Sequence, residues 1–536
     1  MTIDRRSLLG MIGAGAALPV EAAQQRLPEI GFLHGVASGD PTPRGAILWT
    51  RVTPGEATAA SIPVQWLVAD GDRIVARGRT QARASRDWTV KVEPRTLKPG
   101  REYRYWFEAG GRRSPEGRVR TLPVGATPDL VFAVASCALY PGGFFNAYRA
   151  IAGLPRVDAV IHLGDYIYEY GREGYGGAIG QKIGRQVDPP HEIVTLADYR
   201  RRHAQYKSDP DLQACHARAA MIAVWDDHEA TNDAWTDGAE NHQPAAEGDW
   251  RARKAAALQA YFEWMPIRDA APGRPWDAIN RAFRFGDLAT LAMVETRLLA
   301  RAQQASLGGK TDPATIAAAV ARRNDPSREL LGEGQRRWLE GELARSVRSG
   351  VPWQVLGNQV VMARVAGATI DLAKVSESYR PRVAASQAGY AAGLPTNLDS
   401  WDGYPAARER LYASFRRAGA RPIVLAGDSH AFWANRLADA SGTPVAAEFG
   451  ATAITSPSIG DVMPDVPVGD LLAERNEEVV FCDQRAKGYV LLTLTPSAAR
   501  AELRAVSTIM ERDFSERTVA TFEVRSGDPT MEVRRV

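Results

Sequence analysis

The sequence predicts a protein of the α/β class in which a small β-sandwich precedes a larger domain of alternating strands and helices. Residues 32–122 contain short apolar runs separated by Gly, Pro and Asp turns, which is typical of a sandwich. From residue 129 onward, buried apolar strands alternate with helical stretches. The 536 residues, 45% of them hydrophobic, suffice for a large core and exclude a disordered or polytopic membrane protein.

The first 23 residues have the pattern of an export signal. Arg5 and Arg6 precede an apolar run over residues 8–20, and small residues follow at Ala22 and Ala23. The paired arginines predict export through the twin-arginine translocase, to the periplasm or outside the cell. The alternatives are an ordinary Sec signal and an uncleaved anchor. Because the run is shorter than the roughly 20 residues that span a bilayer, no stable membrane anchor is expected.

The predicted sandwich covers residues 31–122 and is immunoglobulin-like or fibronectin-like. Three strand-like runs lie at residues 46–49, 63–68 and 103–108, with turn residues between them. Residues 123–128 are the expected linker to the larger domain.

Charge and cysteine content exclude several classes of protein. Lys and Arg total 66 against 63 Asp and Glu, a net charge of +3, and no basic excess or stripe is evident. Specific nucleic-acid binding is therefore not expected. Three cysteines are too few for a disulfide framework, and Cys215 and Cys482 are interpreted as free or buried thiols.

The larger domain is predicted over residues 129–510, followed by a C-terminal tail of strand and turn over residues 511–536. Residues 171–184 hold six glycines and are interpreted as a mobile loop at the mouth of a pocket. A phosphate cradle is the alternative, but the Walker pattern is absent. Whether a C-terminal element gates the pocket stays open. Apolar residues at helical spacing predict helices over residues 196–206, 250–264 and 334–346.

Polar side chains follow five apolar strands of this domain, each at the point where the strand ends. Because ligands bind at the carboxyl edge of an open α/β sheet, these side chains are expected to meet at one site. Helix capping by Asp and Asn is the alternative, but it does not explain a thiol, a tyrosine and two histidines. The strand-end residues are Cys137, Asp165, Tyr168, Asp227, His228, Asn358, Asp428 and His430.

The spacing of these residues predicts a metal site. Asp165 and Tyr168 are three residues apart, so a helical turn would bring both oxygens to one ion. Asp428 and His430 are two residues apart and would share one side of an extended segment. Carboxylate and amide oxygens suit Ca²⁺, Mg²⁺ or Mn²⁺, whereas a thiolate, a phenolate and an imidazole suit a transition metal, so two different metals are implied. A thiolate, a phenolate and three carboxylates total about five negative charges, which need cations nearby.

The motifs of the chain resemble those of the PhoD-type alkaline phosphatases (alkaline phosphatase D), metallophosphoesterases related to purple acid phosphatases. The resemblance covers nearly the whole chain, and its motifs are specific when taken together. Glu295 stands where Asp is expected. The matching segments are residues 35–41, 48–51, 164–168, 225–229, 295–297, 401–405 and 427–430.

The resemblance implies a four-layer αββα catalytic domain with a two-metal site. Asp165 resembles the carboxylate that both ions share. The second ion is expected to be Ca²⁺, with Mn²⁺, Mg²⁺ or Zn²⁺ as alternatives. The other implied ligands are Cys137, Tyr168 and His430 for a ferric iron (Fe³⁺), and Asp227, Asn358 and Asp428 for the second ion.

Two more residues receive catalytic roles from the resemblance. His228 stands at the position of the histidine in the superfamily's Asn-His-Glu motif and is expected to contact phosphate and to stabilise or protonate the leaving oxygen. Arg297, which follows an apolar strand, either helps to hold phosphate or forms a structural salt bridge. Asp226 is either a partner of His228 or shares the metal role of Asp227.

The implied function is that of an exported, metal-dependent alkaline phosphatase. It would hydrolyse small phosphomonoesters and phosphodiesters by in-line attack of a metal-bound hydroxide. The alternative on the same site is a phospholipase D-like or other dedicated phosphodiesterase. A third hypothesis is a surface-binding protein with an inactive hydrolase domain. The sequence argues against it, because every expected ligand position holds a residue that can bind a metal.

The remaining histidines are expected to have no catalytic role. His162 lies inside an apolar strand and is interpreted as a core residue. His34, His191, His203 and His242 are expected at the surface or in loops.

Overall fold

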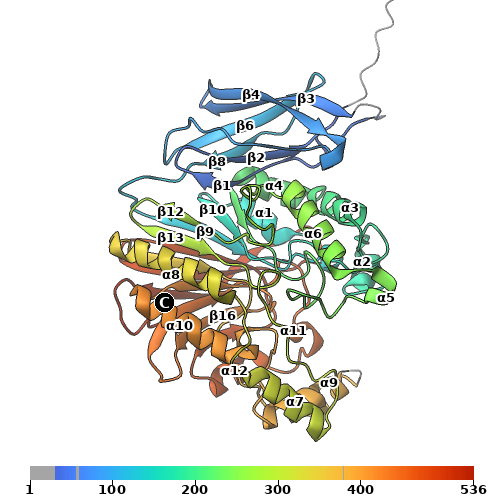
Figure 1. Cartoon of the computed structure of the whole chain (residues 1–536), viewed down its shortest axis with the longest axis vertical. Coiled ribbons are helices and arrows are strands. Elements are labelled where there is room, and N and C mark those ends of the chain that lie inside the picture. Colours follow the sequence, from blue (N-terminus) through green and yellow to red (C-terminus); the bar gives the residue numbers. More distant parts are fainter. Residues whose placement is uncertain (1–29, 56–59, 378) are drawn as a thin grey trace, which may run out of the picture.

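The computed structural model describes residues 30–55, 60–377 and 379–536 (Figure 1). The export signal expected over residues 1–23 lies outside these residues. Within the described ranges, no helix has the length and apolar character needed to cross a membrane.

The first strands form two facing sheets at one end of the molecule (Figure 1). Apolar side chains such as Val64 and Phe107 from one sheet pack against Val36 and Leu48 from the other. The outer sheet consists of β3 (Ser61–Asp70), β4 (Arg73–Arg83), β6 (Glu102–Ala109), β7 (Arg112–Arg113) and β8 (Gly117–Arg120). The facing strands are β1 (Val36–Thr42), β2 (Gly45–Arg51) and β5 (Thr89–Val92).

Strand β1 also connects this region to the larger sheet of the molecule. It pairs in parallel with β11 (Met221–Ala223) at Gly39 and Met221. A Cβ atom at residue 39 would lie 2.2 Å from the carbonyl oxygen of Pro266, so only glycine fits this close approach. The expected linker, residues 123–128, has no regular secondary structure, but the regions on its two sides share one sheet.

Over the described residues, the largest sheet has ten strands in the order β22-β21-β20-β19-β9-β10-β11-β1-β2-β5. Its central strands β9, β10 and β11 are parallel. Strands β20 and β21 pair along nearly their whole length, so the sheet continues across the boundary expected at residue 510. The strands not yet named are β9 (Leu130–Ala135), β10 (Ala159–His162), β19 (Lys487–Leu494), β20 (Ala498–Val506), β21 (Glu516–Arg525) and β22 (Arg534–Arg535).

A second large sheet, with seven strands among the described residues, packs face to face with the first. Side chains such as Val134 on β9 and Val355 on β14 belong to one apolar cluster between the sheets. The strand order is β12 (Arg281–Phe285), β13 (Ala289–Met293), β14 (Trp353–Gly357), β15 (Ile423–Ala426), β17 (Pro444–Gly450), β16 (Phe432–Ala438) and β18 (Val479–Asp483).

Helices cover the outer faces of the two large sheets (Figure 1). The first sheet is covered by α1 (Asn146–Ala152), α3 (Leu196–Lys207), α4 (Pro210–Arg218) and α6 (Trp250–Trp264), and the second by α8 (Gly332–Arg348) and α10 (Pro405–Ala418). The remaining helices are α2 (Gly177–Ile183), α5 (Pro244–Glu247), α7 (Pro313–Asn324), α9 (Arg380–Ala391), α11 (Ile459–Val462) and α12 (Val468–Arg475).

The mixed α/β class and the three predicted helices are confirmed. Helix α3 begins with a capping box of Thr195 and Asp198, and Asp249 caps α6, so polar side chains satisfy amides that have no partner within the helix. The immunoglobulin-like and four-layer descriptions stay predictions. The segment 171–184 is not wholly a loop, because α2 forms within it.

One histidine expected at the surface or in a loop is in neither place. His203 lies on the inner face of α3 and stacks on Trp264 of α6, with ring centroids 6.3 Å apart. His34 and His242 lie in loops, as expected, but both side chains are buried. His191 is exposed, as expected, and the core role of His162 is confirmed, because its Nε2 lies 2.7 Å from the hydroxyl of buried Tyr148.

Candidate active site

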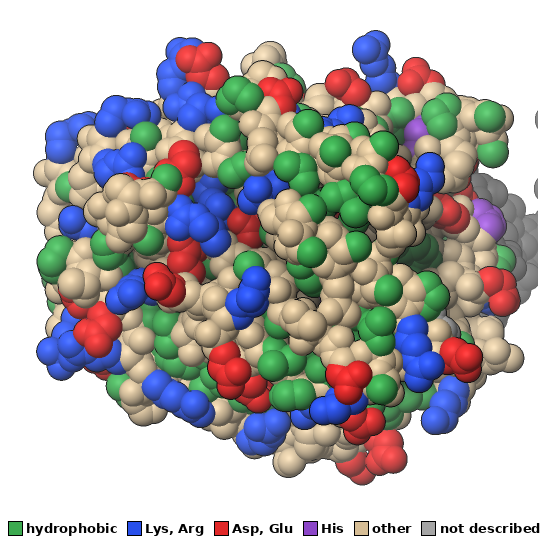
Figure 2. Space-filling view, turned by 90° about the horizontal axis from the view of Figure 1, so that it is seen from below, with side chains coloured by type: hydrophobic (Ala, Val, Ile, Leu, Met, Phe, Trp, Pro, Cys, Tyr) green, Lys and Arg blue, Asp and Glu red, His purple; other side chains and the backbone are tan. Residues whose placement is uncertain are grey.

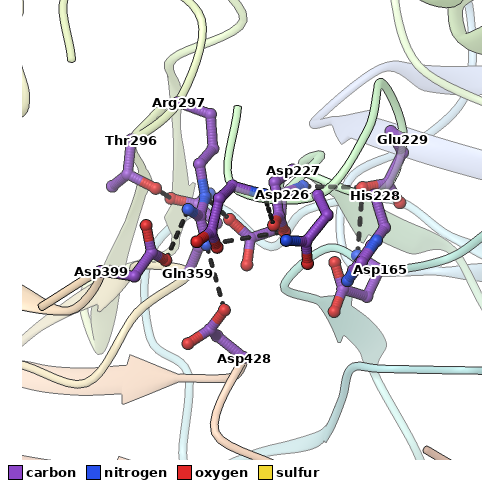
Figure 3. Close-up of polar contacts among 12 residues, drawn as sticks. Asp165, Asp226, Asp227, His228, Glu229, Thr296, Arg297, Gln359, Asp399 and Asp428 are labelled. Atoms are coloured by element: carbon purple, nitrogen blue, oxygen red, sulfur yellow. Dashed lines mark hydrogen bonds and ion pairs between the residues drawn. The ribbon is translucent and has the colours of Figure 1, made fainter. Parts of the chain in front are cut away.

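The ends of the central strands of both large sheets bring buried acidic, thiol and imidazole groups together. Ligand atoms lie within 4.8 Å of one another in three overlapping groups among the described residues, and Figure 3 labels the members of two of these groups. These groups are Cys137 with Asp165 and His430, Asp165 with Asp227 and His228, and Asp226 with Asp227 and Asp428. Six of the seven predicted metal ligands are thus brought together, once Tyr168 is added by its hydrogen bonds.

The first group is held by a short chain of hydrogen bonds. The Tyr168 hydroxyl donates to Oδ2 of Asp165 at 2.9 Å and lies 3.4 Å from Nε2 of His430. Nδ1 of His430 lies 2.7 Å from the carbonyl oxygen of Pro457, which leaves Nε2 free to bind a ligand. Burial raises the pKa of the Cys137 thiol and that of the Tyr168 phenol, so both groups need a nearby cation to deprotonate.

The backbone at four of these positions has an uncommon conformation. The φ angles are +61° at Cys137, +54° at Asp165, +59° at Asp428 and +56° at His430. Left-handed conformations of non-glycine residues carry strain and persist where surrounding structure holds them. The helical turn expected at Asp165 and the extended segment expected at Asp428 were therefore wrong, although the side chains still converge.

The third group, Asp226 with Asp227 and Asp428, surrounds a buried arginine (Figure 3). The Arg297 guanidinium forms an ion pair with Asp226 and lies 3.0 Å from Oδ1 of Asp428 and 3.6 Å from Oδ1 of Asp227. It also bonds Asp399 at 2.6 Å. Arg297 is fully buried, so the structure places it in salt bridges, the second of the two roles considered for it.

The side-chain amide of Asn358 has partners within the protein. Its side-chain oxygen accepts a hydrogen bond of 3.0 Å from Nε1 of Trp401, and its amide nitrogen donates to the carbonyl oxygen of Val360. The amide is therefore already bonded on both sides. Sequence position alone placed it correctly at the end of β14 but could not show these partners.

His228 has a buried carboxylate partner that sequence reasoning missed. Nδ1 of His228 lies 2.7 Å from Oε2 of Glu169, and Oε1 of the same carboxylate accepts hydrogen bonds from the backbone amide of Asn232 and the hydroxyl of Thr231. Burial acts to lower the pKa of His228, but the carboxylates of Asp227 and Glu169 outweigh it and raise the pKa well above its usual value. These two carboxylates therefore favour the protonated ring.

Glu229 was also missed, and it fixes the backbone of two strand-end loops. Its carboxylate accepts hydrogen bonds from the backbone amides of Asp165 at 3.1 Å, Tyr166 at 2.5 Å and Asp226 at 2.7 Å. The chemical signal for such a role was weak, because an acidic residue next to a histidine indicates catalysis as readily as structure.

Several buried oxygens of the site have no hydrogen-bond partner among the described residues. They are Oδ1 of Asp165, Oδ2 of Asp226 and Oδ1 of Asp227. Burial raises the pKa of Asp226 to about 8 and that of Asp428 to about 7, whereas Arg297 and His228 outweigh burial and lower the pKa of Asp227. Unpartnered buried carboxylates are costly unless cations compensate them, so this donor set fits bound metal ions.

The site opens into a cavity of about 950 Å³. Asp165, Asp227 and His228 lie on one wall, together with Asp428 and His430. The glycine-rich segment around Gly176, helix α9 and helices α11 and α12 form the other walls. Figure 2 looks onto this end of the molecule and shows hydrophobic side chains bordering a hollow.

Comparison with known proteins decides the family. The sequence pattern described as "PhoD-like phosphatase" matches residues 132–503, and that of the N-terminal domain of the same family matches residues 17–123. The chain belongs to the PhoD-like phosphatase family. The resemblance seen in the sequence motifs is therefore confirmed.

Two relatives of this PhoD-like phosphatase match over almost its whole length. The chain is 34% identical to alkaline phosphatase D of Bacillus subtilis (strain 168) over 550 residues, which cover 97% of this chain and 87% of the relative. A solved structure of PhoD superposes with a TM-score of 0.79 at 33% identity and covers 96% of this chain and 92% of its own. The chain is accordingly a PhoD-like alkaline phosphatase, a phosphoric ester hydrolase, and the hypothesis of an inactive surface-binding protein is set aside.

Proposed function

We propose that this PhoD-like phosphatase is a metal-dependent enzyme that hydrolyses phosphomonoesters and phosphodiesters. The observation that carries the proposal is the meeting of unpartnered buried carboxylate oxygens with Cys137, Tyr168 and His430 at one end of a large cavity. Such a mixed set of donors supports two unlike ions rather than a single structural one.

The donor types assign the ions to residues. Cys137, Tyr168 and His430, with Asp165 shared, would hold Fe³⁺, and Asp227 with Asp428 would hold the divalent ion, for which Ca²⁺ suits the oxygen donors. Asp226 has an oxygen without a hydrogen-bond partner that would serve the second ion, and the Asn358 oxygen, which accepts one hydrogen bond from Trp401, keeps a second lone pair for the same ion. When bound, such ions supply positive charge that activates water and neutralises the phosphoryl oxygens.

His228 is the group proposed to donate a proton in the reaction. Because Glu169 holds Nδ1, the proton on Nε2 is the one available to the leaving oxygen at the cavity wall. Arg297 orients the carboxylates of Asp226 and Asp428 through ion pairs. Its side chain is fully buried and does not reach the cavity surface. Phosphoryl transfer depends on positioning and charge neutralisation, which these groups supply without a covalent intermediate.

Metal analysis together with the visible spectrum tests the assignment. The mature chain, purified from its native compartment, is expected to contain iron with a charge-transfer band from tyrosinate or thiolate. The Tyr168→Phe variant should lose or shift that band while keeping its fold. Zinc alone, or no metal at all, would contradict the assignment of Cys137 and Tyr168.

A second candidate, a phosphodiesterase for substrates with an apolar group, is favoured by the cavity itself. Its walls include Ile370 and Val383 near α9 and Val462, Met463 and Leu472 near α11 and α12. Comparing turnover of p-nitrophenyl phosphate, bis(p-nitrophenyl) phosphate and phosphatidylcholine vesicles separates the two. Preference for the vesicle by more than tenfold would favour the phospholipase D-like alternative.

Export is the remaining part of the proposal. The twin-arginine route to the periplasm or the medium rests on Arg5 and Arg6. Replacing both by lysine should retain the enzyme in the cytoplasmic fraction, which immunoblots of cell fractions would detect. Unchanged export of the double variant would favour the Sec alternative.

A further inference from the structure

Positive charge is concentrated in the N-terminal region of the chain. Residues 31–122 contain 16 Lys and Arg and 9 Asp and Glu, a net charge of +7, whereas the whole chain carries only +3. The rest of the chain is therefore net negative. The net charge of the whole chain does not reveal this asymmetry, because the two regions carry opposite net charges.

The structure places part of this charge in a row on strand β4. Arg77, Arg79 and Arg83 are exposed and occupy alternate positions, so they project from the same face of the strand. That face points away from the sandwich core, because the intervening Gly78 and Ala82 face inward. In Figure 1, β3, β4 and β6 form the layer farthest from the helices that surround the cavity.

These three arginines differ from their neighbours in having no ion pair. Within the described residues, neither Arg77, Arg79 nor Arg83 has a carboxylate partner, whereas Arg104 and Arg113 both pair with Glu116 at 3.3–3.4 Å. A groove of about 600 Å³ includes Arg79 of the row, and its lining also holds Gln65, Gln81, Arg113 and one acidic residue, Glu108. The row therefore offers charge that the fold itself does not neutralise.

We propose that the row Arg77, Arg79 and Arg83, with the adjoining groove, binds a linear polyanion, namely inorganic polyphosphate. Exposed positions two residues apart on a strand are about 7 Å from each other, so a flexible phosphate chain lying along β4 meets Arg77 and Arg79 in succession and reaches Arg83 beyond Gln81. Trp106 is buried beneath Arg113 at 4.0 Å and offers no free ring on which a nucleobase could stack. A bare phosphate chain therefore suits the surface better than a nucleic acid.

A lipid membrane fits the same surface less well. Large apolar side chains exposed on β4 in the structure are Ile74, 40% exposed, and Val75, 37% exposed, both at one end of the strand. Membrane docking of a sheet face needs a wider apolar or aromatic contact together with the charge. The binding surface lies on the sandwich and the hydrolytic residues lie in the other domain, so the proposal does not depend on the proposed hydrolytic mechanism.

Fluorescence anisotropy with end-labelled long-chain polyphosphate tests the proposal on the full mature chain. The Arg77→Gln/Arg79→Gln variant should bind polyphosphate at least about tenfold more weakly in low salt. The slope of its log Kd against the logarithm of the salt concentration should be smaller by about 1.4. The matched control is Arg517→Gln/Arg525→Gln, which removes two exposed arginines, also without ion pairs in the described structure, from strand β21. The control should bind within about twofold of the unmodified chain.

Four further measurements check the fold of the variants, their activity and the choice of ligand. Both variants should keep the thermal unfolding midpoint and the turnover of p-nitrophenyl phosphate, which shows that fold and active site are intact. Equal weakening in both double variants, or no binding by the unmodified chain in low salt, overturns the proposal. Tighter binding of a single-stranded oligonucleotide or of anionic phospholipid vesicles than of polyphosphate overturns the choice of ligand. Binding by the Arg77→Gln/Arg79→Gln variant that equals binding by the unmodified chain also overturns the proposal, whatever the turnover.

Discussion

Replacing Glu169 by glutamine should impair catalysis selectively for substrates with poor leaving groups. The carboxylate lies 2.7 Å from Nδ1 of His228 and is one of the charges that raise the pKa of that ring. A hydrogen bond to a charged group contributes about 1.5–3 kcal/mol, which corresponds to about 10- to 100-fold in rate. Glutamine keeps the shape and a hydrogen bond but removes the charge. Glu169 therefore acts as a positioning residue for His228.

The assay compares kcat for phenyl phosphate and for p-nitrophenyl phosphate. The phenolate of phenyl phosphate leaves poorly and needs the proton from His228, so its kcat should fall by about 10- to 100-fold, whereas that of the nitrophenyl ester should fall much less. Glu240→Gln is the matched control, because Glu240 lines the same cavity, is exposed, and bonds Asn232 rather than His228. An equal fall for both substrates would refute the reasoning.

Three other expectations concern stability. Burial lowers the pKa of His203 to about 3, so the neutral ring contributes its full stabilisation above pH 6.5, and the free energy of unfolding falls by up to about 5 kcal/mol as the pH falls to 3. In urea titrations at several pH values, His203→Phe should therefore lose less stability in acid than the unmodified chain. An equal loss in both would contradict this expectation. Gly39→Val should cost at least about 2 kcal/mol by collision with Pro266, and a stability equal to that of the unmodified chain would refute the close approach. Arg297→Met should lower the free energy of unfolding by about 3–5 kcal/mol because it leaves buried carboxylates unpaired. Arg337→Met, at an exposed ion pair, should lower it by under about 1 kcal/mol, and similar losses in the two variants would show that the buried ion pairs do not stabilise the fold more than the exposed one.

The convergence of the site residues could be predicted because it follows from topology. Cys137 and Asp165 follow adjacent parallel strands, and parallel strands end at the same edge of a sheet. Asp428 and His430 arrive from the second large sheet at the facing edge. Their roles as metal ligands stay predictions, but their meeting is a property of the fold.

The residues that sequence reasoning missed act through partners that no local pattern reveals. Glu169 reaches His228 across 59 residues, and Trp401 donates a hydrogen bond to the Asn358 oxygen across 43 residues. The arginines of β4 are a different case. Their spacing is visible in the sequence, but the net charge of the whole chain does not reveal it, because acidic residues elsewhere offset the positive charge of the sandwich.

The strain at the strand ends explains why Glu229 is buried without a cationic partner. Left-handed φ angles at Cys137, Asp165, Asp428 and His430 cost about 1–3 kcal/mol each, so other contacts must hold these loops in place. Glu229 accepts three backbone amide hydrogen bonds, including that of Asp165, from two different loops. Burial raises the pKa of Glu229 to about 8, although the three amides act to lower it. The hydrogen bonds of Glu229 thus hold the backbone of the two loops from which Asp165 and Asp227 project.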